Sequence, residues 1–200
     1  MTGQPKINKM SPRTEKQYEE IRSSKRKLIL DTALELFARE GYYPSSISKI
    51  AKAAGISKGL IYNYFESKED IIRTIILQGI KDLSDLFDPN KDGVLTKEEI
   101  RYFIDEVFET VRKDEHFWKL YFMVFMQPPV IKLVEKPFSE LIHNSMDLLI
   151  DYFKRQGYED PETEAILLGA ILDGIGFHFV MNPVGFPIDK VKERIIQMYS

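Results

Sequence analysis

The chain has 200 residues and a formal net charge of −3 at pH 7, and hydrophobic residues make up 44% of it, enough to build a core. The absence of cysteine excludes disulfides, thiolate metal sites and a cysteine nucleophile. No stretch approaches the ~20 uncharged apolar residues that cross a bilayer, and the first residues lack the apolar run of a secretory signal. We therefore expect a cytoplasmic protein with no membrane partner.

The charge is distributed unevenly along the chain. Residues 1–70 carry a net charge of +4, whereas residues 71–200 carry −7. A basic N-terminal part on an acidic remainder suggests that only the N-terminal part approaches a polyanion.

Helical periodicity extends over nearly the whole chain from Ser24 onward, and strand-like alternation is absent. The polar residues 1–22 predict a flexible N-terminal arm. Caps and turn signals such as Gly41, Pro128-Pro129 and Gly157 separate the expected helices. These cover about 24–40, 47–54, 58–65, 68–83, 96–113, 116–126, 137–156, 161–181 and 187–199. The predicted fold class is all-α.

The segment 45–65, "SSISKIAKAAGISKGLIYNYF", carries the most specific signal. Two short helices joined through Gly55 and Ser57 are what a helix-turn-helix requires, because glycine takes the left-handed turn without steric cost. Ile56 can pack between the two helices. The outer surface or its edges are then left to Lys58, Gly59, Leu60, Tyr62, Asn63 and Tyr64.

These outward residues suit a DNA groove. Serine at the helix start and Lys58 can contact phosphates, Leu60 a thymine methyl, and Asn63 a base edge. The tyrosines can contact phosphates as well. The alternative is that Leu60, Tyr62 and Tyr64 are core residues of a small helical domain.

Residues 28–72 resemble the DNA-binding head of the TetR family of transcriptional regulators. The resemblance rests on a leucine-phenylalanine helix, a glycine-aromatic turn, an isoleucine-alanine helix and a tyrosine-rich recognition helix. Tyr64 stands where many relatives have histidine. The resemblance implies a head over 23–68 and an effector-binding, dimerising body over 69–200. It implies DNA contacts from Ser45, Ser46, Ser57, Lys58, Gly59, Leu60, Tyr62, Asn63, Tyr64 and Lys68.

The body contains an unusually aromatic helix, "HFWKLYFMVFM", at 116–126. Two interpretations fit it: core packing, or one wall of a pocket for an apolar or aromatic effector. The residues of this predicted pocket are Trp118, Tyr121, Phe122, Phe125 and His178.

The segment 165–181 carries small residues four apart, which let two helices approach closely. With the last helix of the chain it suits the homodimer interface that the family resemblance implies. Asp173 and His178 interrupt this apolar stretch, and they either hydrogen-bond across the interface or face a pocket.

The segment 88–99 matches the ligand pattern of an EF-hand calcium loop, with Gly93 at the sixth position. The predicted calcium ligands are Asp88, Asn90, Asp92, the Val94 carbonyl, Thr96 and Glu99. A competing explanation is an ordinary turn followed by a capping box of Thr96 and Glu99. No other cofactor is expected.

The three histidines are widely spaced, and no nucleophile elbow or phosphate loop is present, so we do not expect an enzyme. The sequence favours a ligand-responsive transcriptional regulator, a repressor that binds a near-palindromic double-stranded DNA operator as a dimer. The alternative is a calcium-binding helical interaction module that uses the 88–99 loop.

Overall fold

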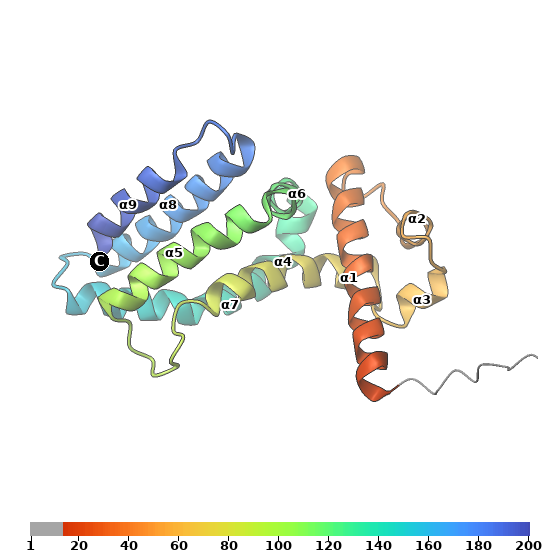
Figure 1. Cartoon of the computed structure of the whole chain (residues 1–200), viewed down its shortest axis with the longest axis horizontal. Helices are drawn as coiled ribbons and strands as arrows, with labels where there is room; N and C mark the ends of the chain where they lie inside the picture. Colours follow the sequence, from red (N-terminus) through yellow and green to blue (C-terminus); the bar gives the residue numbers. More distant parts are fainter. Residues whose placement is uncertain (1–13) are drawn as a thin grey trace, which may run out of the picture.

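The computed structural model describes residues 14–200, and its regular elements within that range are all helices (Figure 1). This confirms the all-α prediction. A small head contains α1 (Glu15–Glu40), α2 (Ile47–Ala53) and α3 (Lys58–Tyr62). The body contains α4 (Lys68–Ser84), α5 (Lys97–Lys113), α6 (Glu115–Phe125), α7 (Pro128–Arg155), α8 (Pro161–Met181) and α9 (Ile188–Tyr199).

The first helix starts earlier than the sequence predicts. Thr14 and Gln17 form a capping box, in which each side chain bonds the backbone N–H of the other residue. Residues 15–22, predicted to belong to a flexible arm, are therefore helical. Residues 1–13 of that predicted arm lie outside the described part of the chain.

The start of α7 also differs from the prediction. The Pro128-Pro129 pair was expected to form a turn before a helix at 137, but it opens α7 instead. Proline fits the first turn of a helix because the N–H that it lacks has no acceptor there. The pair thus marks a helix boundary, as predicted, but α7 begins at it rather than after it. Pro137 lies inside α7.

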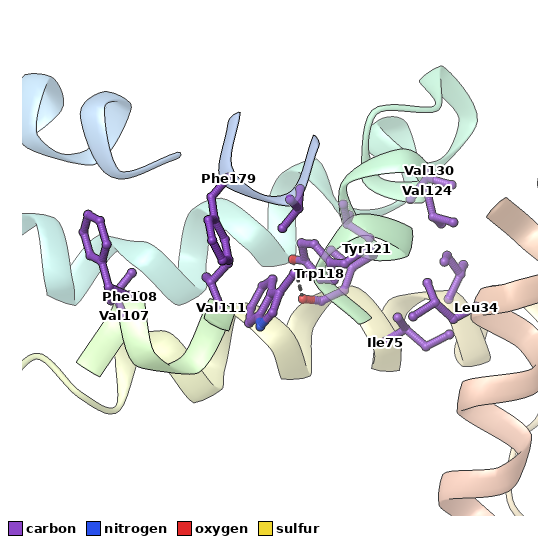
Figure 2. Packing of buried hydrophobic residues seen from close by; sticks show 14 of the residues in the cluster. Leu34, Ile75, Val107, Phe108, Val111, Trp118, Tyr121, Val124, Val130 and Phe179 are labelled. Carbon is purple, nitrogen blue, oxygen red and sulfur yellow. Dashed lines mark hydrogen bonds between the residues drawn. The ribbon is translucent and has the colours of Figure 1, made fainter. Parts of the chain in front are cut away.

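Helix α6 lies between the head and the rest of the body (Figure 1). It packs against α1 on one side and against α8 on the other, while α7 packs against α4 and α8. Figure 2 shows Trp118 and Tyr121 of α6 between Val111 and Phe179 of the body and Leu34 of α1. One hydrophobic core therefore continues from the body into the head.

Helix α8 is long and apolar enough to cross a membrane by length and composition alone, which the sequence analysis did not anticipate. One side of it packs against α5, α6 and α7. The other side is mostly apolar and exposed in the single chain, with Ile166, Leu167, Phe177 and Met181 open to solvent and Asp173 exposed on the same side. An exposed apolar surface of this kind is typical of a protein–protein contact.

Candidate nucleic-acid interface

The turn between α2 and α3 is built around Gly55. This glycine has a φ of +65°, in the left-handed region that favours glycine. The N–H of Ile56 donates to the carbonyl of Ala51 over 3.0 Å, which closes the end of α2. Ser57 then caps α3, because its Oγ accepts the N–H of Leu60 over 3.1 Å. The chain turns and starts α3 as a helix-turn-helix requires.

Helix α3 has a polar side open to solvent and an apolar side packed into the head. Lys58, Gly59 and Asn63 are exposed, and Tyr62 is 50% exposed, whereas Ile61 is fully buried. The ammonium of Lys58 lies 5.7 Å from the centroid of the Tyr62 ring, so cation and ring form one surface. This arrangement favours the DNA-facing interpretation of Tyr62 over the core interpretation.

Leu60 and Tyr64 lie at the border between these two sides. Both are half-buried, and Tyr64 packs against the hydrophobic core. The two capping serines, Ser46 of α2 and Ser57 of α3, are exposed. Their hydroxyls already accept backbone N–H groups, and they remain accessible to a phosphate at the surface.

The structure places Ser45 inside the head, which corrects its prediction as a DNA contact. Its side chain is 2% exposed, and its Oγ donates to the carbonyl of Gly41 over 2.8 Å. The neighbouring Ser46, not Ser45, offers a hydroxyl at the surface, because only Ser46 occupies the exposed N-cap of α2.

Lys68 at the start of α4 is occupied by contacts within the head. Its Nζ donates to the carbonyls of Tyr42 over 2.9 Å and Ser45 over 3.1 Å. The same ammonium lies 4.1 Å from the centroid of the Tyr42 ring. Lys68 thus holds the loop between α1 and α2 in place, and the predicted phosphate contact would compete with these bonds.

Of the two aromatic residues after Gly41, one lies in the core and the other at the surface. Tyr42 is buried, and its hydroxyl donates to Glu69 over 2.8 Å. Burial raises the pKa of the Tyr42 phenol, and the backbone amide of Glu69 and this hydroxyl lower the pKa of the Glu69 carboxyl. Tyr43 is 76% exposed, although it is not among the predicted DNA contacts. The available signal was a second aromatic residue beside Tyr42 in the turn between α1 and α2, where the structure buries only one of the two rings.

The aromatic residues of α6 are packed together in the core. Tyr121 is buried, and its hydroxyl donates to the Ile76 carbonyl of α4 over 3.0 Å. Trp118 is also buried, with its ring centroid 5.2 Å from that of Tyr121. Phe125 stacks on Tyr121, and Phe122 lies 3.5 Å from where a Cβ on Gly176 would stand. These four predicted pocket residues are therefore neighbours.

His178, the fifth predicted pocket residue, lies outside this cluster. It is exposed and stacks on Phe186, with 6.4 Å between ring centroids. A cleft of about 320 Å³ lies between α1 and α4. Its apolar floor contains Leu30, Leu34, Ile75 and Phe117. The aromatic cluster itself is filled by its own side chains.

The loop between α4 and α5 is organised by its acidic side chains. Asp88 accepts the N–H groups of Asp92 over 3.3 Å and Gly93 over 2.9 Å, and Gly93 has a φ of +77°. Thr96 and Glu99 form the capping box of α5. Within residues 14–200, no group of three or more His, Asp or Glu side chains is placed to hold a metal ion. The capping explanation therefore accounts for the observed bonds of Glu99.

The fold and the exposed side of α3 define a helix-turn-helix DNA-binding protein. Residues 29–75 match the family of bacterial regulatory proteins named tetR. Taken with the relatives described next, this match over the head supports the predicted resemblance to the TetR family of transcriptional regulators.

Three relatives extend beyond the head. The fatty acid metabolism regulator protein of Bacillus subtilis (strain 168) is 26% identical over 163 residues, 81% of this chain and 78% of that protein. The negative regulator IcaR of the biofilm operon icaADBC of Staphylococcus epidermidis is 28% identical over 62% of this chain and 67% of its own. FadR from Bacillus subtilis in complex with stearoyl-CoA superposes with a TM-score of 0.67 at 21% identity, covering 86% of this chain and 96% of that one. The last comparison establishes a shared fold.

Proposed function

We propose that this regulator is a cytoplasmic, dimeric repressor that reads an operator with α3 and is released by a small-molecule effector. The observation that carries the proposal is the exposed Lys58–Tyr62 surface on the capped five-residue helix α3. A cation and an aromatic hydroxyl on such a helix fit the phosphates and base edges of a major groove. IcaR, named as a negative regulator, supports repression as the direction of control.

Dimerisation is supported by the exposed apolar side of α8. Ile166 is 63% exposed in the single chain, and Met181 is 58% exposed. Gly169 and Gly174 each have no atom within 4 Å of an added Cβ, so a second helix could approach closely there. We propose that α8, with α9, pairs with its copy about a two-fold axis. The two copies of α3 would then read the halves of a near-palindromic site.

The effector is proposed to be apolar or aromatic and to act through α6. The FadR relative holds stearoyl-CoA, which carries a long apolar chain. In this chain α6 contacts both the head and α8, so a ligand that wedges beside Trp118 and Phe122 would move α6. Such a ligand would favour dimers in which the distance between the two heads does not match adjacent major grooves. It would thus shift the population of conformations away from the one that binds DNA.

Calcium is proposed as a second, separate ligand at the 88–99 loop. The observation in its favour is the backbone: Lys91 has a φ of 59° and Gly93 one of 77°, and the apolar Leu95 at the eighth position is fully buried. Binding would require Asp88, Asp92 and Glu99 to converge from their present hydrogen bonds.

The test of DNA reading is a double variant, Lys58→Ala with Tyr62→Ala. The probes are duplexes enriched by the wild-type protein from a random library. We expect the affinity for these duplexes to fall by at least about tenfold. The slope of log affinity against log salt concentration should become shallower by roughly one, because the lost lysine no longer releases a counterion. Fluorescence anisotropy at several salt concentrations measures both.

The matched control is Tyr102→Ala with Lys119→Ala, which removes an exposed tyrosine and an exposed lysine from the body. We expect the control to bind like the wild type. Equal affinity and equal salt slope for both double variants would contradict DNA reading by α3.

A further inference from the structure

Gln127, between α6 and α7, directs its side chain away from its own helix. It occupies the N-cap position of α7, but its side chain makes no capping bond there. Its Nε2 donates instead to the carbonyl of Phe37 over 3.0 Å, and its Oε1 accepts the N–H of Tyr42 over 2.8 Å. One body side chain thus binds both ends of the turn that leaves α1.

The two partners of Gln127 are backbone groups that solvent cannot easily satisfy. Phe37 is fully buried and Tyr42 is 3% exposed. The carbonyl of Phe37 also accepts the N–H of Gly41, so the amide of Gln127 completes the C-terminal end of α1. A primary amide supplies one donor and one acceptor together. Glutamate could accept from Tyr42 but could not donate to Phe37, and leucine could do neither.

Tyr42 connects this contact to the DNA-reading elements. Its N–H is held by Gln127, its carbonyl by Lys68 over 2.9 Å, and its hydroxyl by Glu69 over 2.8 Å. The turn that contains Tyr42 leads directly into α2, and α2 packs against α3. The corner between α6 and α7 is therefore joined by hydrogen bonds to the segment that carries the helix-turn-helix.

The other polar link between α6 and the head is weaker. His116 at the start of α6 lies 2.7 Å from Glu35 of α1, but both side chains are largely exposed. Exposed pairs of this kind contribute little, because water competes for both groups. The bonds of Gln127 to Phe37 and Tyr42 are partly buried, as are the bonds of Lys68 and Glu69 of α4 to Tyr42.

We infer that Gln127 is a positioning residue that fixes the angle between the DNA-reading head and the body, and that it passes movement of the α6–α7 corner to the helix-turn-helix. The consequence for the operator rests on the proposed function, whereas the angle itself does not. A loss of the amide should leave the head folded but let it take a range of orientations.

The test uses the natural absence of cysteine. Spin labels at Lys52→Cys in α2 and Lys154→Cys in α7, both exposed positions, report the distance from head to body. Labelled chains are diluted with unlabelled chains, so that only distances within one chain contribute. Pulsed electron–electron double resonance gives the distribution of distances between the two labels. This distribution is compared for the wild type, Gln127→Leu, Gln127→Glu and the control Gln156→Leu. Gln156 is exposed at the other end of α7.

We expect a narrow distribution for the wild type and the control, and a broadened or shifted one for both Gln127 variants. Circular dichroism must show that each variant keeps the helix content of the wild type. If Gln127→Leu does not fold, the test relies on Gln127→Glu. On the enriched duplexes, both Gln127 variants should lose roughly fivefold or more in affinity, because fewer chains hold the competent angle. Unchanged distributions in both variants overturn the inference. Broadened distributions in a protein that binds no duplex uphold the inference and contradict the proposed function.

Discussion

Gly79 of α4 lies against the ring of Tyr121, so closely that a Cβ at this position would stand 2.7 Å from the Cε2 atom. The ring cannot move aside easily, because it is buried and its hydroxyl donates to Ile76. Glycine in a helix interior otherwise costs roughly 0.5–1 kcal/mol relative to alanine. The absence of a side chain at Gly79 therefore serves the contact between α4 and α6.

We predict that Gly79→Ala destabilises the protein by about 1–2 kcal/mol, because overpacking a filled core costs roughly 1–3 kcal/mol and outweighs the helix propensity gained. The control is Gly59→Ala in α3, where an added Cβ would meet only the Oγ of Ser57 at 4.0 Å, so this variant should be neutral or stabilising. Urea unfolding followed by circular dichroism measures both free energies. A stabilised Gly79→Ala would show that the Tyr121 ring can rearrange.

At the scale of the elements, local signals predicted most of the helices. The serines before α2, α3 and α4 accept backbone N–H groups and cap these helices, as serine at the start of a helix commonly does. The turn at Gly55 likewise follows from one residue. Caps and tight turns depend on residues within four positions of each other, so they can be predicted from a short stretch of sequence.

What the sequence could not predict depends on contacts between distant residues. Ser45 and Ser46 are adjacent and identical, and only the packing of α1 decides that Ser45 is buried. Lys68 is bound by carbonyls 23 and 26 residues away. The contact of Gln127 with Phe37 spans 90 residues and carries no local pattern. The helix-turn-helix was thus predictable, whereas its attachment to the body was not.

The loop between α4 and α5 gives a prediction at this scale. We expect millimolar calcium to bind weakly, with a dissociation constant on the order of 10⁻⁴–10⁻³ M, because the loop has three carboxylates and no paired loop. Calorimetry should show heat for the wild type. Glu99→Gln should abolish it while keeping the capping box, since glutamine serves at that position too.

Glu98→Gln is the matched control for this loop, because Glu98 is an exposed neighbour outside the ligand pattern. It should bind calcium like the wild type. If the wild-type protein gives no heat, the loop is a capped turn only.

At the scale of the whole molecule, the head and body form one continuous core in which α6 has contacts on both sides. Because α6 contacts both α4 and α1, a displacement of α6 in the body can reach α1 of the head directly, without a flexible linker between head and body. The body is acidic and the N-terminal part is basic, so DNA is attracted to the head and repelled from the remainder. This is consistent with the proposal that the body carries the dimer surface.

The exposed side of α8 then gives the prediction for the assembly. Ile166→Glu with Phe177→Glu places two charges on this apolar surface, and burying unpaired charges in a dimer would be strongly unfavourable. We expect the wild type to sediment with the mass of two chains and the double variant with the mass of one.

The control Tyr102→Glu with Ile131→Glu charges two similarly exposed apolar residues on α5 and α7 and should remain dimeric. Because one head offers only half of the contacts to a two-fold site, the monomeric variant should also bind the enriched duplexes far more weakly. If the double variant in α8 stays dimeric while the control dissociates, the two chains pair through another surface.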